Sequence, residues 1–459
     1  MTRGRLALHA HFYQPPRRDP FSGAMPREPK AAPYHDWNER ITAECYRPNA
    51  ERGNFGRIGW NVGPTLTAWL AAEAPDVLGA IAAQDLGRNG IAQGYHHTIL
   101  PLASARDRRT EIRWGMRDFE YRFGRRSTGF WLPETAVDLA TLRDLAAEGV
   151  RWTILAPWQA GTDGDLEVRR PYRVVLGGGQ AIEVFFFDAA ASAAIGFDAA
   201  ATADADRFAR EHVVPRLATA LRDGSSPLLL AATDGETYGH HRTFRDLFLE
   251  RLTRSPEGSA ADPRRFDSAT LGEVLAAPPT TALPVMTVLE RTSWSCHHGI
   301  ARWTAECPDA PDGRWKGPLR AALDRLAAGI DAVSERLAHE RDADLWSLRD
   351  HYVDAETGIV SAGRLAPDPL VRELLAAQAS RLAMFASDAW FWGEPDRAET
   401  EHALLCAAHA ARIVDRHGGT HLERLLVDDL ASLRSPATGR DGAAIYRHAL
   451  EAVGQPAEA

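Results

Sequence analysis

The chain has 459 residues, of which 45% are hydrophobic and 25% are charged, and it carries a formal net charge of -9. A chain of this length has room for roughly two or three domains, and its balance of residue types is that of an ordinary globular protein. The acidic charge argues against a nucleic-acid partner and a polybasic membrane-binding surface, and no apolar run is long enough to span a bilayer.

Cysteine usage and the first residues bear on the expected compartment. Four cysteines in a chain of this length do not indicate a disulfide scaffold. The apolar core of the first segment, LALHA, is too short and too interrupted by histidine for a secretory signal. We therefore expect a cytoplasmic protein.

The first part of the chain alternates short apolar strands with amphipathic helices. Strands are predicted at 6–9, 91–102, 129–133, 152–156, 183–187 and 228–232. Helices are predicted at 66–86, 106–123, 136–148, 208–221 and 243–253. Residues 17–60, rich in Pro, Arg, Asn and Gly, predict a long loop with short helical pieces. This alternation is typical of a parallel α/β fold, most simply a barrel.

The pattern changes after about residue 290. Segments 318–337 and 370–459 have helical spacing with many Ala, Leu, Arg and Glu residues. The stretch 254–287, rich in Pro, Ser and Ala, forms the expected transition. We predict two domains, an α/β barrel over residues 1–287 and an all-helical domain over residues 288–459.

Two apolar runs end in carboxylates. The stretch 227–241, PLLLAATDGETYGHH, predicts a buried strand that opens onto Asp234 and Glu236. The stretch 129–135, GFWLPET, has the same form, with Glu134 at its tip. Enzymes with α/β folds carry their sites at the carboxyl ends of strands. Two carboxylates on separate strand ends therefore suggest acid/base or nucleophilic chemistry on one bond.

Each carboxylate also has a purely structural interpretation. Glu134 precedes a predicted helix, where an acid is favourable, and Asp234 is able to close the strand in an Asx-turn. However, desolvation by buried apolar residues raises the pKa of a nearby carboxylic acid, which then becomes a usable proton donor at neutral pH. Glycoside cleavage requires such a pair, one carboxylate as nucleophile or base and the other as acid.

The histidines occur in clusters: His9 and His11, His96 and His97, His240 and His241, and His297 and His298. Clustered histidines raise the possibility of zinc, but no HExxH or Cys-x-x-Cys spacing accompanies them. Core histidines, or histidines that bind substrate hydroxyls, are the favoured interpretation, and we expect no catalytic metal. Cys296 and Cys307, with His297 and His298 between them, are the best remaining metal candidate, although buried thiols are the simpler interpretation.

Five motifs in order carry a family resemblance. They are HAHFYQPP at 9–16, IAQGYHHTILPL at 91–102, GFWLPE at 129–134, ATDGETYGHH at 232–241 and ASDAWFW at 386–392. Through them the chain resembles glycoside hydrolase family 57, in the branch whose C-terminal part was long labelled a domain of unknown function. Phe12 and Tyr13 before Gln14, and Ala389 within the fifth motif, depart from the usual pattern at positions that concern sugar binding.

The resemblance implies a (β/α)7-type barrel followed by a helical domain that contributes to the active-site cleft. It implies a retaining mechanism with Glu134 as nucleophile and Asp234 as general acid/base, and it implies neither metal nor cofactor. The substrate-binding positions that it implies, with Glu236 as a supporting acid, are His11, Gln14, His97, Trp131, Glu236, His240, Asp388 and Trp390. Trp158 and Trp294 are further candidate stacking platforms.

The expected function is that of a retaining glycoside hydrolase or transglycosylase on α-glucan, of the amylase, 4-α-glucanotransferase or branching type. A metal-dependent polysaccharide deacetylase or mannosidase-like enzyme is one alternative. The other is a carbohydrate-binding relative that has lost catalysis, although both carboxylates are present. The expected partner is a carbohydrate, while the acceptor and the oligomeric state are left open.

Overall fold

The computed structural model describes residues 4–162, 164–221, 225–254, 266–277 and 282–456. Contacts within it divide the chain into two compact units. The first unit comprises the residues up to Gln14, Glu28–Gln93 and Arg122–Trp294, and the second Pro15–Arg27, Gly94–Tyr121 and the residues from Ser295. Two segments of the expected barrel domain, 15–27 and 94–121, thus group with the C-terminal helices. The expected domain border at residue 287 stays a prediction.

The first unit contains two sheets. One has the order β2-β1-β8, with β9 also paired to β1, and the other has the order β3-β4-β5-β7-β6. The strands of the first sheet are β1 (Gly4–Phe12), β2 (Gly59–Val62), β8 (Leu228–Asp234) and β9 (Phe266–Ser268). Those of the second are β3 (Ala92–Gln93), β4 (Gly129–Trp131), β5 (Trp152–Leu155), β6 (Tyr172–Gly177) and β7 (Gln180–Phe186). All pairs are parallel except β6 with β7.

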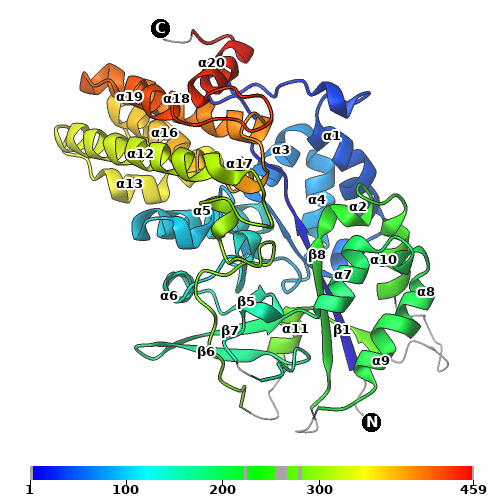
Figure 1. Ribbon diagram of the computed structural model, residues 1–459. Coiled ribbons are helices and arrows are strands. Elements are labelled where there is room, and N and C mark those ends of the chain that lie inside the picture. Colours follow the sequence, from blue (N-terminus) through cyan, green and yellow to red (C-terminus); the bar gives the residue numbers. More distant parts are fainter. Residues whose placement is uncertain (1–3, 163, 222–224, 255–265, 278–281, 457–459) are drawn as a thin grey trace. The chain divides into compact units, whose positions relative to one another are not determined.

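Two local contacts join these sheets into a barrel. Trp60 of β2 forms a parallel bridge with Gly90, just before β3. Asp188, just after β7, donates its main-chain N–H to the carbonyl of Leu230 in β8 at 2.7 Å. In the part of the chain that is described, seven strands therefore follow one another: β1, β2, β3, β4, β5, β7 and β8. Figure 1 shows β1 and β8 running side by side. The expected barrel-type α/β fold with a helical C-terminal part is confirmed.

The packing of β8 in the barrel core explains why the sequence of this strand is an unbroken apolar run. Leu228, Leu230 and Ala232 share one face because strand side chains alternate, and they pack in one cluster with residues of β5 and β7. Leu229 is buried as well, so both faces of the strand are covered, as is usual in parallel sheets.

The connecting helices begin with recognisable signals. Asp138 caps α6 by accepting the N–H of Thr141, and Thr270 and Glu273 form a capping box at α11. The helices of the first unit are α1 (Trp37–Ile41), α2 (Arg47–Glu51), α3 (Pro64–Glu73), α4 (Pro75–Ala83), α6 (Leu139–Ala147), α7 (Ala189–Phe197), α8 (Ala205–Phe208), α9 (Val214–Leu217), α10 (Arg245–Thr253) and α11 (Leu271–Ala276). π-Helical turns at Thr42–Tyr46 and Ala209–Val213 interrupt two of the helical stretches.

The second unit is helical, with α12 packed against α16, α18 and α19. Buried Leu319, Leu323, Leu326, Ile330 and Leu337 recur at the spacing of one helix face along α12. The helices are α5 (Ala105–Phe123), α12 (Lys316–His339), α13 (Leu345–His351), α14 (Val353–Glu356), α15 (Ala362–Leu365), α16 (Pro369–Ala383), α17 (Asp388–Phe391), α18 (Ala398–Gly418), α19 (Leu422–Leu430) and α20 (Gly442–Ala452). No helix in the described ranges combines the length and the apolar character needed to cross a bilayer.

One predicted strand is wrong over most of its length. Residues 91–102 form a strand only at Ala92–Gln93 and then turn away, with His97 in the left-handed region at φ 58°. Gly94 and Pro101 in this stretch are poor strand residues, so its apolar residues pack as a buried loop instead. β2 and β6 were not predicted, because β2 is short and β6 is an alternating edge strand among many polar residues.

Candidate active site

The strand register brings polar side chains to one level at the carboxyl ends of β1, β2 and β8. His11 on β1 pairs with Asn61 on β2 and with Asp234 on β8. On the other sheet, Gln93 pairs with Trp131. The carboxyl end of the barrel, where parallel α/β enzymes place their chemistry, is therefore lined by predicted site residues and by Asn61 and Gln93.

Trp131 connects the two sheets. Its indole stacks on the rings of His11 and His9, with centroids 5.0 and 5.2 Å away, while the edge of Trp294 meets it at 5.0 Å. Trp131 is fully buried. Its placement is that of a side chain that holds its neighbours rather than one that offers a free face to a ligand.

Trp294 holds Glu134 at two points. Its indole Nε1–H donates to the Glu134 carboxylate oxygen Oε2 at 3.0 Å, and its main-chain N–H donates to the Glu134 carbonyl at 3.1 Å. A carboxylate that accepts such bonds loses rotamer freedom, so Glu134 is set in one orientation before any ligand arrives.

The backbone at Glu134 is strained. Glu134 and Thr135 have φ values of 57° and 48°, in the left-handed region that β-branched residues avoid. Gln159 holds this conformation, since its Oε1 accepts the Thr135 hydroxyl at 2.9 Å and its Nε2 donates to the Thr135 carbonyl at 2.8 Å. Strained backbone that is held by its surroundings is characteristic of functional sites.

Asp234 ends β8 and is accessible to solvent. Even so, desolvation by the surrounding protein raises its pKa to about 6. Asp234 therefore keeps its proton in a useful fraction of molecules near neutral pH. A side chain at the next residue, Gly235, would overlap the ring of Phe12, so this position requires glycine for β8 to pass so near β1.

Glu236 lies deeper than Asp234. Its Oε1 accepts the Tyr46 hydroxyl at 2.6 Å and the Tyr13 main-chain N–H at 3.1 Å. Burial raises its pKa to about 8, and the neighbouring Asp234 charge adds to the rise. Gln14 Nε2 in turn donates to the Tyr46 hydroxyl at 3.2 Å. Glu236 is thus a buried acid tied to the loops around it, which fits a supporting position.

Asn61 orders the two histidines of β1. Its Oδ1 lies 3.1 Å from His9 Nε2, and its Nδ2 donates to His11 Nδ1 at 2.8 Å. Burial lowers the pKa of His9 to about 4, so this ring is neutral at physiological pH. Because an amide nitrogen only donates, the proton of a neutral His11 ring is on Nε2.

His240 is paired with an acid. Its Nδ1 lies 2.5 Å from Glu44 Oε2 and its ring meets the edge of Trp37 at 5.8 Å. Glu44 belongs to the π-helical turn that also carries Tyr46. The loop after β8 and this turn therefore support one another, and the contact of His240 with substrate stays a prediction.

The second and fifth motifs meet inside the second unit. His97 Nδ1 lies 2.7 Å from the Ser387 hydroxyl, and the Ser387 N–H donates to the His97 carbonyl at 3.1 Å. Burial lowers the pKa of His97 to about 3, which keeps the ring neutral. Asp388, the first residue of α17, follows directly.

Trp390 on α17 is fully buried, and its indole N–H donates to the Lys316 carbonyl at 3.3 Å. The Arg320 guanidinium covers its ring at 4.1 Å. Trp390 therefore anchors α17 in the second unit, as Trp131 anchors the strand end in the first.

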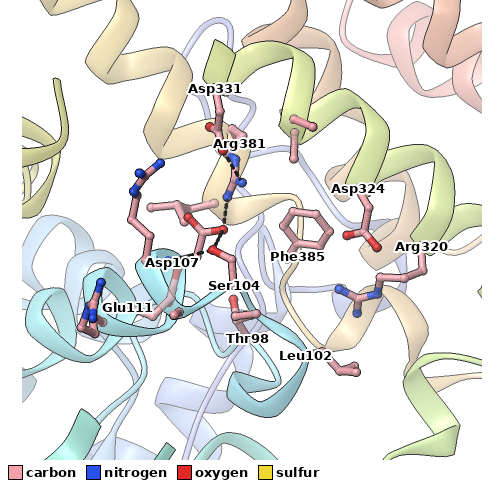
Figure 2. A pocket seen from close by; sticks show the side chains of 17 residues that line it. Thr98, Leu102, Ser104, Asp107, Glu111, Arg320, Asp324, Asp331, Arg381 and Phe385 are labelled. Atoms are coloured by element: carbon pink, nitrogen blue, oxygen red, sulfur yellow. Dashed lines mark hydrogen bonds and ion pairs between the residues drawn. The ribbon is translucent and has the colours of Figure 1, made fainter. Parts of the chain in front are cut away.

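A cavity of about 560 Å³ lies in the second unit, between α5, α12 and α16. Figure 2 shows Arg381 on its wall between Asp107 and Asp331, to which it is bonded at 2.6 and 2.8 Å. Arg381, Asp107 and Asp331 thus form a buried ion-pair network on one part of the cavity wall.

The structure thus sorts the predicted residues into two groups. In the first unit, Trp294 contacts His11, Trp131 and Glu134. Tyr46 forms a second connection there, because it binds both Gln14 and Glu236. His97, Asp388 and Trp390 belong to the second unit.

Asn61, Gln93 and Tyr46 were missed from the sequence. Asn61 could have been found as the polar residue within the apolar run GWNV. No pattern in the sequence pointed to Tyr46.

Comparisons with known proteins agree with this architecture. The model of glycosyl hydrolase family 57 matches residues 65–266, and that of a domain of unknown function, DUF3536, matches residues 369–454. No curated protein matches the sequence.

Solved structures resemble the chain along nearly its whole length. The exo-type maltose-forming amylase of Pyrococcus sp. ST04 has a TM-score of 0.76 at 15% identity, over 97% of this chain and 88% of that one. The branching enzyme of Pyrococcus horikoshii has a TM-score of 0.67 at 16% identity, over 93% and 94%. The α-amylase of Thermotoga maritima has a TM-score of 0.62 at 14% identity, over 97% and 99%.

At these identities the solved structures establish the fold alone. The chain carries a glycosyl hydrolase family 57 domain over residues 65–266 and a DUF3536 domain over residues 369–454, and the family 57 domain identifies it as an enzyme of the glycoside hydrolase class.

Proposed function

We propose that the protein is a retaining enzyme that cleaves or transfers α-glucan chains, with Glu134 as nucleophile and Asp234 as general acid/base. The observation that carries this proposal is the contrast between the two strand-end carboxylates. Glu134 is held in place by the Trp294 indole, whereas Asp234 is solvent-accessible and has a pKa of about 6. One is prepared for attack and the other for proton transfer.

In the first step, a Glu134 carboxylate oxygen forms a bond to the anomeric carbon of the sugar. The bond from that carbon to the leaving oxygen breaks, and Asp234 gives its proton to this oxygen. In the second step, Asp234 takes a proton from water or from an acceptor sugar hydroxyl, whose oxygen attacks the anomeric carbon and releases Glu134. Two inversions return the original configuration, and the carboxyl groups need a separation of about 5–5.5 Å.

The α-glucan substrate is proposed from family membership and from what the similar solved structures are called, a maltose-forming amylase and a branching enzyme. His11, Gln14, His97, His240 and Asp388 are the proposed contacts to sugar hydroxyls. Trp131 and Trp390, which were also predicted to bind substrate, are fully buried; we propose that Trp131 acts by holding His11, on whose ring it stacks. Glu236 serves as a buried acid beside Asp234.

The alternative of a metal-dependent deacetylase or mannosidase-like enzyme receives no support from the strand ends. Among the described residues, the group whose metal-binding atoms converge is Cys296, His298 and Cys307, which belongs to the second unit. An inactive carbohydrate-binding relative is also disfavoured, because both carboxylates are present and one of them is actively positioned.

Product analysis tests the proposed function. The protein is incubated with amylose, maltooligosaccharides and a panel of aryl α-glycosides, and we measure free reducing ends, chain-length redistribution and new α-1,6 linkages. We expect at least one of these products from the wild type and none from Glu134→Gln. The matched control, Glu211→Gln, alters an exposed glutamate and retains wild-type activity. Wild-type turnover by Glu134→Gln would overturn the assignment.

A further inference from the structure

The second unit contains a cluster of two thiols and an imidazole that the proposed chemistry does not use. Cys296 and Cys307 are almost fully buried, and their sulfur atoms lie 3.8 Å apart. Together with His298 they present metal-binding atoms that all lie within 4.8 Å of one another. The three residues come from one loop that runs from Ser295 to Ala310.

The sulfur separation matches that across a tetrahedral ion. Zinc–thiolate bonds of about 2.3 Å at a tetrahedral angle place two sulfur atoms about 3.8 Å apart. A disulfide would require about 2.05 Å, so the two sulfurs are in contact but not bonded. Two thiolates and one imidazole are the donors that zinc prefers.

Main-chain groups surround the two sulfur atoms. The Cys296 sulfur receives main-chain hydrogen bonds from Arg302 and His298, which offset part of the rise that burial causes in the pKa of this thiol. Cys307 starts a tight turn, closed by the Ala310 N–H on the Cys307 carbonyl at 2.8 Å. A bound metal ion removes the proton from a coordinating thiol, and main-chain N–H groups directed at sulfur are common partners of the resulting thiolate.

Asp309 orients the imidazole. Its Oδ2 lies 3.2 Å from His298 Nδ1 and accepts the His297 main-chain N–H at 2.7 Å. A carboxylate on one ring nitrogen directs the other toward a metal, as in carboxylate–histidine–zinc arrangements. The His298 side chain is 44% exposed, so solvent is available as a fourth ligand.

Lys316 lies beside the cluster. It is fully buried, and its side-chain nitrogen donates to the Arg302 carbonyl at 2.8 Å. Burial lowers the pKa of Lys316 to about 8 and the Arg302 charge lowers it further, whereas negative charge on the Cys307 and Cys296 sulfurs acts in the opposite direction. Two thiolates cancel the charge of a divalent ion, so a zinc ion held by them adds no net positive charge beside Lys316.

We propose that Cys296, His298 and Cys307 bind one zinc ion, which fixes the loop 295–310. The same loop supplies Arg302, whose guanidinium donates to the Phe391 carbonyl at 3.0 Å and to the Asp309 carbonyl at 2.8 Å. The same guanidinium lies over the Phe391 ring, with its central carbon 4.5 Å from the ring centroid. The ion thereby braces the segment that holds α17. Its role is structural, and the proposal does not depend on the identity of the substrate.

Metal content tests the proposal directly. The full-length protein is purified without a metal-affinity tag, and zinc is measured by plasma mass spectrometry. We expect roughly one zinc per chain, as in structural zinc sites. Cys296→Ser, Cys307→Ser and His298→Ala are expected to lose this zinc. Two matched controls, His297→Ala beside the site and Cys406→Ser at a buried thiol on α18, are expected to keep it.

A second measurement uses only the wild type, so it is independent of whether a variant folds. A mercurial reagent that blocks thiols is added in the presence of a chromogenic zinc indicator, and about one equivalent of zinc is expected to be released. Metal-free protein titrated with Co²⁺ should show thiolate charge-transfer absorption. Zinc at background level, a Cys296–Cys307 disulfide in the isolated protein, or equal zinc loss in the control variants would each overturn the proposal.

Discussion

Different physical effects act on the two candidate catalytic carboxylates. Desolvation raises the pKa of Asp234 to about 6, whereas two hydrogen bonds from Trp294 fix the position of Glu134. Glu236 differs again, since burial raises its pKa to about 8 while Tyr46 and Tyr13 bind its carboxylate. At the scale of single residues, these differences favour Asp234 as the proton donor, Glu134 as the nucleophile and Glu236 as a supporting acid.

The first prediction concerns pH. A general acid works only when protonated, so kcat/KM should be high below the pKa of Asp234 and fall above about pH 6, roughly tenfold per pH unit. A pH profile of kcat/KM on an active glucan substrate measures this. Glu236→Gln should keep the same alkaline limb. If that variant abolishes the limb, Glu236 rather than Asp234 is the acid.

The second prediction concerns the hydrogen bond to Glu134. Trp294→Phe keeps an aromatic ring but removes the indole N–H that binds Oε2. Hydrogen bonds to charged groups contribute about 1.5–3 kcal/mol, so kcat should fall roughly 10- to 100-fold. Trp346→Phe is the matched control, since it removes an indole N–H that binds the Glu335 carboxylate of the second unit instead. Equal rates for the two variants would contradict the positioning role.

At the scale of elements, the strand ends and the turns that follow them set the site. The left-handed backbone at Glu134 and Thr135 is held from the neighbouring strand end by Gln159, which lies after β5. The π-helical turn Thr42–Tyr46 supplies Tyr46 to Glu236 and Glu44 to His240. Such turns are frequent at functional sites because they redirect side chains.

The third prediction tests the role of Gln159. Gln159→Met preserves the volume but leaves the buried Thr135 groups and the Ala156 N–H without their partner. We expect a loss of about 1–3 kcal/mol in the free energy of unfolding and a fall in kcat larger than the change in KM. Gln180→Met, at an exposed site on β7, serves as control. Unchanged stability and kcat would show that the left-handed backbone at Glu134 and Thr135 does not depend on Gln159.

Sequence patterns located the strand ends because each apolar run stops at a carboxylate, as at Asp234 and Glu134. The same patterns could not reveal the partners of these carboxylates. Trp294 reaches Glu134 across 160 residues, and Tyr46 reaches Glu236 across 190. No local periodicity encodes such contacts. The strand predicted over 91–102 failed for a related reason, since tertiary burial of a loop produces the same apolar run as a strand.

At the scale of the whole molecule, the grouping of 94–121 with the C-terminal helices is the main departure from a simple two-domain order. Helix α5 carries Asp107 and Thr110, which bind the fully buried Arg349 of α13 at 2.9 and 3.1 Å. Arg381, on the wall of the cavity, binds the same Asp107 and so belongs to this network as well (Figure 2). A segment within the chain is thus part of the core of the helical unit.

The fourth prediction measures this connection. Arg349→Met removes one of the two arginines that bind the buried Asp107, which keeps Arg381, so the free energy of unfolding should fall by about 1.5–3 kcal/mol. The control, Arg336→Met, removes an exposed ion pair with Glu340 and should cost at most about 0.5 kcal/mol. Chemical denaturation of both variants gives the values. Equal small losses would mean that α5 is not held by this network.

The central claim is that Glu134 forms a covalent bond to the sugar. The most direct test is to trap that intermediate with a 5-fluoro-α-glucosyl fluoride, whose reactive leaving group allows the first step while the ring fluorine slows the second. Trypsin digestion releases residues 127–143, which contain Glu134. Mass spectrometry should place one added glycosyl group on Glu134. A label on another carboxylate, or turnover of the reagent with inverted configuration and no label, would contradict the account.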